Sequence, residues 1–248
     1  MKKLILIICL ALMSSATFCQ TKVMKITRKN GQSESVVLSE IRKITFESVD
    51  SIVTDIDGNG YKTITIGNQI WMAENLKVTR YNDGTPIFPM TGASQIFDLY
   101  DSSTGGFCAY NFDSSNVQEY GYLYNWRSVN TGKLAPVGWH IPTKSDWETL
   151  INYLGGESVA GGKLKETGTD HWNGQNIDAS NIVWFSALAG GLISASGVVN
   201  LRTSGLWWSS TESEELGAYS LSLYYDSGSV YISSESKPSC FSIRCIKN

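Results

Sequence analysis

Short runs in which hydrophobic and polar residues alternate predict β-strands over most of this chain. The first two runs cover 23–29 and 35–38, and the dipeptide Asn30-Gly31 between them is a typical hairpin turn. A third strand-like run follows at 43–46. We therefore expect a β-hairpin segment over 21–48. Because an isolated hairpin is only marginally stable, this segment should pair with the rest of the chain or with a second copy.

One segment has the spacing of an amphipathic helix. Hydrophobic residues recur there at helical intervals: Trp147, Leu150, Ile151 and Leu154. Thr143 precedes them as an N-cap, with Asp146 three residues further on, which is the arrangement of a capping box. These residues predict a helix at about 143–154, anchored in the core by its apolar face.

The clearest strand pattern lies near the C-terminal end, over 219–225. Its hydrophobic positions alternate with Ser220, Ser222 and Tyr224, which predicts a strand that is buried on one face only. A turn at 226–229 then leads into another strand. On this pattern the two serines and Tyr224 face outward.

The rest of the chain, 52–248, has the pattern of one α+β domain of about two hundred residues. Its first turn, at 55–60, superficially resembles a calcium loop, but Ile66 stands where a bidentate Glu is required, so we expect a hairpin turn and no cofactor. The stretch at 82–120 is long, polar and rich in turn residues. Such a stretch is expected to be functional or to be tied down.

Composition and charge exclude some classes of protein. Hydrophobic residues make up 42% of the 248 residues and charged residues only 17%, so the chain can fill a core. The formal net charge of −3 argues against a nucleic-acid partner, which would need a basic face.

The first residues predict export. A basic start is followed by an apolar run at 4–13, and the layout of 1–19 is that of a secretory signal peptide. Cleavage after Cys19 leaves Gln20 first. A lipoprotein anchored through Cys19 is less favoured, because bulky Phe18 stands where such signals prefer a small residue. No later apolar run is long enough to cross a membrane, so we expect a secreted or outer-surface protein.

Cysteines agree with an oxidising compartment. Three remain after the signal is removed: Cys108, Cys240 and Cys245. A final strand over 241–246 would place Cys240 and Cys245 on opposite faces and roughly 16 Å apart, too far for a bridge. We therefore expect a disulfide between Cys108 and Cys245, which ties down the polar stretch.

Seven segments carry successive motifs of one family. They are WMAENL at 71–76, YGYLYNW at 120–126, LAPVGWHIPT at 134–143, KLKETG at 163–168, FSAL at 185–188, WWSSTE at 207–212 and FSIRC at 241–245. Together they resemble the Fibrobacter succinogenes major paralogous domain, from about residue 54 onward. The piece at 141–148 with the terminal Arg-Cys strand is also similar to C-type lectin-like folds and to formylglycine-generating enzymes.

The resemblance implies an exported lectin-like domain with small twisted antiparallel sheets, few helices and long loops. It implies no catalytic activity. We expect the domain to bind a glycan or protein ligand at the cell surface. Lectin-like folds commonly bind near their C-terminal strands, and the candidate binding residues there are Glu212, Ser220, Ser222, Tyr224 and Tyr231. A purely structural surface component is the alternative.

Two enzyme hypotheses are weaker. Cys240 and Cys245 have the spacing of the copper-binding pair of formylglycine-generating enzymes, but opposite strand faces prevent them from converging on one ion. Four glutamates could pair as glycosidase carboxylates, although sequence does not place them at catalytic separation: Glu74, Glu119, Glu166 and Glu212. With only two histidines, His140 and His171, a histidine-rich metal site is excluded.

Overall fold

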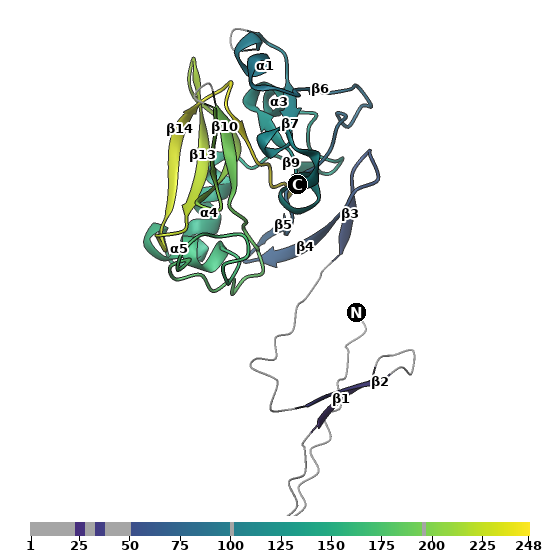
Figure 1. Ribbon diagram of the computed structural model, residues 1–248, viewed down its shortest axis with the longest axis vertical. Helices are drawn as coiled ribbons and strands as arrows, with labels where there is room; N and C mark the ends of the chain where they lie inside the picture. Colours follow the sequence, from purple (N-terminus) through teal and green to yellow (C-terminus); the bar gives the residue numbers. More distant parts are fainter. Residues whose placement is uncertain (1–22, 28–32, 38–50, 100–101, 195–196) are drawn as a thin grey trace, which may run out of the picture. The chain divides into compact units, whose positions relative to one another are not determined.

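The computed structural model describes residues 23–27, 33–37, 51–99, 102–194 and 197–248 (Figure 1). The chain forms two compact units, Met1–Phe46 and Glu47–Asn248. In the first unit, β1 (Val23–Thr27) pairs antiparallel with β2 (Ser33–Val37), which confirms the predicted hairpin. The signal peptide expected at 1–19 and the strand expected at 43–46 lie outside the described residues.

The second unit contains a five-stranded sheet that joins distant parts of the chain. In spatial order its strands are β3 (Ile52–Thr54), β4 (Gly60–Ile66), β5 (Gln69–Met72), β16 (Ile246–Lys247) and β9 (Trp139–His140). The hairpin of β3 and β4 confirms the turn predicted there. Because β16 lies between β5 and β9, the C-terminal end of the chain joins these two strands into one sheet.

A second, nine-stranded sheet runs through the same unit. Its main path is β14 (Val230–Ser236), β13 (Gly217–Tyr224), β12 (Ser204–Glu214), β10 (Gly190–Ser194), β15 (Cys240–Phe241), β8 (Leu123–Asn125), β7 (Gly106–Cys108) and β6 (Phe88–Pro89). The remaining strand, β11 (Gly197–Leu201), pairs with β10. The β10–β12 and β6–β7 pairs are parallel and the other strand pairs of the described residues are antiparallel, so the expectation of antiparallel sheets holds for most pairs.

Helices are few and short within the described residues. They are α1 (Ala93–Asp98), α2 (Val117–Tyr120), α3 (Trp126–Asn130), α4 (Lys144–Tyr153) and α5 (Glu157–Leu164), with 3-10 turns at Tyr110–Phe112 and Ser114–Asn116. The helix predicted at 143–154 is α4, and Thr143 and Asp146 form the predicted capping box. Figure 1 shows α4 and α5 at the lower end of the strands β13 and β14.

Two large hydrophobic clusters form the core of the second unit. In one, Trp71 of β5 stacks on Trp147 of α4 with ring centroids 4.7 Å apart. In the other, Trp208 of β12 stacks on Phe241 of β15 at 4.2 Å. Trp71 and Trp147 are 76 positions apart in the sequence and Trp208 and Phe241 are 33 apart, so each pair meets only when separate segments of the unit fold together.

Both faces of β13 are buried, which corrects the prediction of a half-exposed strand. Leu221 and Leu223 pack in one cluster, while Ala218 on the opposite face packs in the other. Ser220 and Ser222 share the face of Ala218 and are 0% and 1% exposed. The alternation of hydrophobic and polar residues predicted the strand and its two faces correctly. It could not predict that the second face is also covered, because the serines reveal only that this face is polar.

The predicted disulfide is also wrong. Cys108, Cys240 and Cys245 are all free and buried. Cys108 shares a small cluster with Cys240, while Cys245 belongs to the large cluster around Trp208. The reason lies in the strand order, since β7 and β15 both pair with β8 and thereby bring Cys108 and Cys240 to the same region. The neighbouring Cys108 thiol, with burial, raises the pKa of Cys240 well above its usual value.

The last strand is not continuous over 241–246 as predicted. The strand β15 ends at Phe241, and β16 begins at Ile246. Between them, Ile243 and Cys245 enter the Trp208 cluster, as their shared face predicted. The residue between those two, Arg244, is 1% exposed and points to the opposite side.

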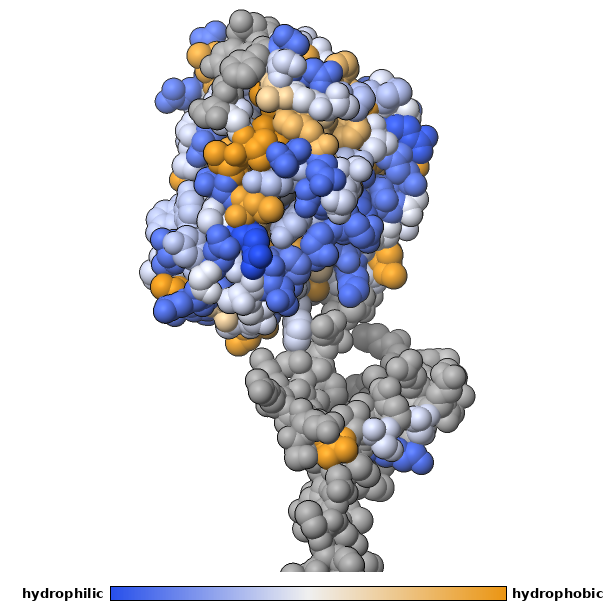
Figure 2. All heavy atoms as spheres, viewed as in Figure 1, coloured by the Kyte–Doolittle hydropathy of each residue, from blue (hydrophilic) through white to orange (hydrophobic). Residues whose placement is uncertain are grey.

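The surface of the second unit is mostly polar. Exposed large hydrophobic side chains include Val137, Ile182 and Leu216. On the face drawn in Figure 2, hydrophobic residues gather mainly in the upper part, with hydrophilic residues between and below them. Within the described residues, no helix combines the length and the apolar character that crossing a membrane would require.

Candidate ligand-binding site

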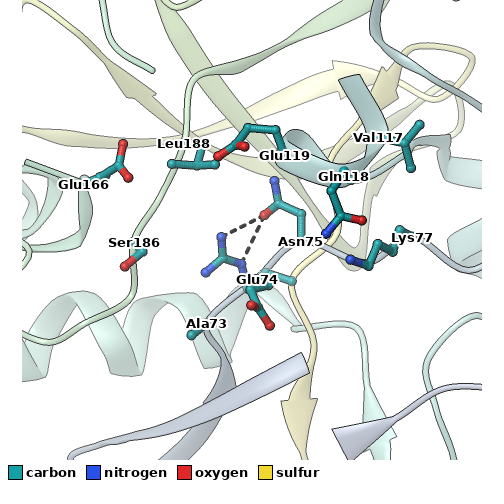
Figure 3. A pocket seen from close by; sticks show the side chains of 12 residues that line it. Ala73, Glu74, Asn75, Lys77, Val117, Gln118, Glu119, Glu166, Ser186 and Leu188 are labelled. Carbon is teal, nitrogen blue, oxygen red and sulfur yellow. Dashed lines mark hydrogen bonds between the residues drawn. The ribbon is translucent and has the colours of Figure 1, made fainter. Parts of the chain in front are cut away.

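A pocket of ≈ 190 Å³ opens in the second unit where several of the segments that carry family motifs meet. Its walls come from the chain that follows β5, from α2, and from the segments around 166 and 186 (Figure 3), and Arg244 also lines it. The lining residues are Ala73, Glu74, Asn75, Lys77, Val117, Gln118, Glu119, Gly121, Glu166, Ser186, Leu188 and Arg244. The long stretch 82–120 therefore contributes a wall to this site through α2, and no cysteine bridge holds it there.

Arg244 is a buried cation at the base of the pocket. Its Nε and Nη2 atoms donate to Oδ1 of Asn75, at 3.1 and 2.8 Å, and Nη1 donates to the backbone oxygens of Met72 and Phe185. These four bonds leave one of the five guanidinium N–H groups, on Nη2, without an acceptor in the described chain. Arg244 also forms no ion pair with a described carboxylate. Burial lowers its pKa to about 9.

Asn75 fixes the orientation of this guanidinium. Besides the two bonds from Arg244, its Oδ1 accepts a hydrogen bond from Nε1 of Trp207 at 2.9 Å. Its Nδ2 donates to the backbone oxygen of Tyr120 at 2.9 Å. One amide thus joins β12, the end of α2 and the C-terminal segment, and it gives Arg244 little freedom to move.

The rim of the pocket is acidic and contains a histidine bridge. His171 places Nδ1 2.6 Å from Oε2 of Glu166 and Nε2 2.9 Å from Oε1 of Glu119. Each ring nitrogen of His171 therefore faces one carboxylate oxygen. The bridge connects α2 to the 166–171 segment, and the ring of His171 also meets Tyr120 edge-on at 5.7 Å.

A third carboxylate, Glu74, also lines the pocket (Figure 3). Its Oε2 accepts from the backbone N–H of Lys62 at 2.7 Å. One oxygen of Glu74 is thus held by a backbone N–H, and one oxygen each of Glu119 and Glu166 contacts a ring nitrogen of His171. The second oxygen of each has no bonding partner in the described residues.

Gly121 allows the backbone to turn at the wall of the pocket. Its φ of +74° lies in the left-handed region, where side chains are strained. A Cβ atom at this position would also stand 2.7 Å from the backbone oxygen of Leu76. A glycine is therefore required for α2 to end close to the chain that carries Glu74 and Asn75.

The structure does not combine the five residues predicted to bind a ligand into one surface. Tyr224 and Tyr231 are 37% and 47% exposed, and their rings meet edge-on at 5.6 Å. Ser220 and Ser222 share their sheet face but are buried, so they cannot contact a ligand from solvent. Glu212 is paired with Lys237, whose ammonium lies over the ring of Trp126 at 4.8 Å.

Sequence reasoning named three of the pocket residues but missed its centre. Glu74, Glu119 and Glu166 were candidates as acids, and the structure brings them to one rim, while Glu212 lies apart. Arg244 and Asn75 were not singled out, because the strand pattern gave Arg244 only an outward face. A usable signal existed, since both residues lie inside motif segments, at 71–76 and 241–245.

The described residues contain no group of three or more His, Cys, Asp or Glu side chains that could hold a metal ion. In the turn that resembles a calcium loop, both oxygens of Asp55 are occupied by protein donors. They accept from the backbone N–H groups of Asp57 and Asn59, from the Asn59 side chain and from Tyr61. This carboxylate therefore stabilises the hairpin.

Comparison with known proteins gives one match. Residues 64–247 match the family described as the Fibrobacter succinogenes major domain. Neither the curated proteins nor the solved structures include a significant match.

Proposed function

Since the chain belongs to the Fibrobacter succinogenes major domain family, we propose that it is an exported, non-catalytic protein that binds a ligand in the Arg244 pocket. The proposal also assigns a C-type lectin-like fold to the second unit. What supports that assignment is a mostly β domain with few helices and long loops. The disulfide expected between Cys108 and Cys245 is not formed, so it does not support the assignment of a lectin-like fold.

One observation carries the proposal: a buried arginine, one of whose N–H groups has no acceptor in the described chain, lines a pocket. A buried polar group without a partner costs free energy, and an incoming acceptor would recover that loss. Binding pockets typically combine a concave site with a few convergent polar groups. Here these groups come from motif segments along almost the whole second unit.

Binding is favoured over glycoside cleavage by the state of the three acids. Hydrolysis requires one carboxyl group that carries a proton and donates it to the leaving group. Glu119 and Glu166 instead each contact a ring nitrogen of His171, and Glu74 accepts from the backbone N–H of Lys62. Each acid is thus held by a protein group at one oxygen and offers only the other oxygen to a ligand.

The copper and thiol oxidase alternative gains no support. Cys245 packs in the Trp208 cluster and Cys240 in the cluster with Cys108, so the two thiols do not line one site. Burial raises the pKa of Cys245, which disfavours the thiolate that copper chemistry needs.

The experiment is a screen of the full-length protein on glycan and host-protein arrays, followed by substitution of the pocket. Leu188→Phe fills space beside Glu119 without removing a hydrogen bond, so binding should be lost. Leu216→Phe, the same change at an exposed position, should leave binding intact. An array ligand that binds both variants equally well would refute the pocket as the site. Tyr224→Ala and Tyr231→Ala test the aromatic pair as an alternative site.

Export is tested separately by cell fractionation. The protein should be found outside the cytoplasm, with Gln20 as its first residue. A lipid on Cys19 would support the lipoprotein alternative, and a cytoplasmic location would refute export.

A further inference from the structure

The pocket combines unused hydrogen-bond donors and unused acceptors over a short span. The acceptors are the second carboxylate oxygens of Glu74, Glu119 and Glu166, which have no partner in the described chain. The donors are the Nη2–H of Arg244 and the hydroxyl proton of Ser186, whose Oγ accepts from Asn181 at 2.9 Å. In Figure 3 the side chains of Ser186, Glu119 and Glu74 lie around the same pocket, with Leu188 beside Glu119, and Arg244 also lines it.

Both carboxylates and cations line the pocket, so a charged ligand of either sign meets groups of its own charge. An anionic ligand that reaches Arg244 must pass three carboxylates, and a cationic ligand drawn to the carboxylates meets Arg244 and Lys77. A hydroxyl group avoids both penalties, because it donates one hydrogen bond and accepts up to two others. Several adjacent hydroxyl groups can therefore satisfy the carboxylates and the guanidinium together.

The size of the pocket limits how much of a ligand can enter. Its volume is ≈ 190 Å³. This is below the range of about 300–1,000 Å³ that is typical of sites for drug-sized ligands. One small ring with its hydroxyl groups fits this space, while a run of several residues does not.

We propose that the Arg244 pocket binds a single neutral sugar ring, such as the end residue of a glycan. The ring hydroxyls donate to the free oxygens of Glu119, Glu166 and Glu74 and accept from Arg244 and Ser186. Ala73, Val117 and Leu188 supply the apolar contact. This inference rests on the proposed function, since it names the ligand class of the same site.

The test is calorimetric titration of the full-length protein with defined probes. They are the neutral methyl glycosides of glucose, galactose, mannose and N-acetylglucosamine, the charged sugars glucuronate and glucosamine, and trialanine with free or blocked ends. At least one neutral glycoside should bind with a Kd on the order of 1 mM. Glucuronate, glucosamine and trialanine should bind about tenfold more weakly or not at all.

Variants locate the binding. Glu119→Gln and Ser186→Ala should each weaken the glycoside about fivefold, because each removes one hydrogen bond to the ring. The matched control is Glu148→Gln, an exposed acid on α4 paired with Lys144, which should leave affinity unchanged. Leu188→Phe should abolish binding, which keeps the test decisive if a polar variant fails to fold.

The outcomes separate the two proposals. The sugar proposal is overturned if charged sugars or trialanine bind more tightly than every neutral glycoside. It is also overturned if no glycoside binds at about 10 mM. If an array ligand is still lost in Leu188→Phe, the pocket remains a binding site for another ligand class. If array binding survives Leu188→Phe, the proposed function fails as well.

Discussion

At the scale of single residues, the hydrogen bonds of Arg244 and Asn75 both stabilise the folded chain and shape the pocket. The planar guanidinium forms four hydrogen bonds that an ammonium group cannot reproduce from the same position. Arg244→Lys should therefore lower the free energy of unfolding by about 2–4 kcal/mol, measured by urea denaturation. Arg202→Lys is the control, because Arg202 is exposed and its side chain donates to the Thr169 backbone oxygen, so its effect should stay within about 0.5 kcal/mol.

A second buried cation gives a prediction about pH. Lys165 is 0% exposed and its Nζ donates to the backbone oxygens of Ile177, Tyr224 and Ser227, at 2.8–2.9 Å. Burial lowers its pKa to about 8 in the folded state, below the usual 10.5 of an unfolded chain. Between these values the unfolded chain binds more protons, so the contribution of Lys165 to stability rises with pH.

The change that isolates this effect is Lys165→Met. The difference in free energy of unfolding between the wild type and the variant should grow by about 2 kcal/mol in favour of the wild type from pH 7.5 to pH 10. Using the difference cancels the titration of other groups, such as the buried tyrosines. A difference that stays constant over this range would contradict the lowered pKa.

At the scale of elements, the His171 bridge holds α2 against the 166–171 segment. His171→Ala removes both contacts with Glu119 and Glu166, each a partly exposed pair worth about 0.2–1 kcal/mol. Amide hydrogen exchange of α2 should become about two- to fivefold faster, as measured by mass spectrometry at fixed pH. His140→Ala is the matched control and should leave α2 unchanged, since His140 contacts Asp146 and Asn248.

The capping box of α4 gives another prediction at this scale. Thr143 and Asp146 exchange hydrogen bonds at the first turn, and although burial opposes it, the bonds from Thr143 and His140 lower the pKa of Asp146. Thr143→Ala should cost about 1–2 kcal/mol of stability, measured by thermal unfolding. Thr149→Ala in the middle of the same helix should cost less than about 0.5 kcal/mol, since Thr149 is exposed.

At the scale of the whole molecule, the two units have separate internal contacts. Removing residues 1–46 should therefore leave the thermal transition of the second unit unchanged within about 2 °C. We also propose that the hairpin of β1 and β2 mediates self-association. The full-length protein should then sediment as a larger species than the truncated one. Equal masses for the two forms would refute that role.

Much of the fold could be predicted because it depends on local patterns. The hairpin at β1 and β2, the start of α4 at Thr143 and the two faces of β13 all follow from the spacing of a few neighbouring residues. The assignment of Ser220 and Ser222 to solvent failed for a different reason. Alternation identifies the two faces of a strand, but not what another part of the chain places against each face.

The sequence by itself determined the family, the mostly β architecture and the types of residue available for chemistry. Only the tertiary structure decided which of these residues meet. It placed Cys108 beside Cys240, not Cys245, and it gathered three of four candidate acids around Arg244 while leaving Glu212 with Lys237. Strand order, which depends on packing between segments far apart in the chain, fixes such encounters. Local spacing does not encode that order, so a pocket built from five distant segments becomes visible only when the chain is folded.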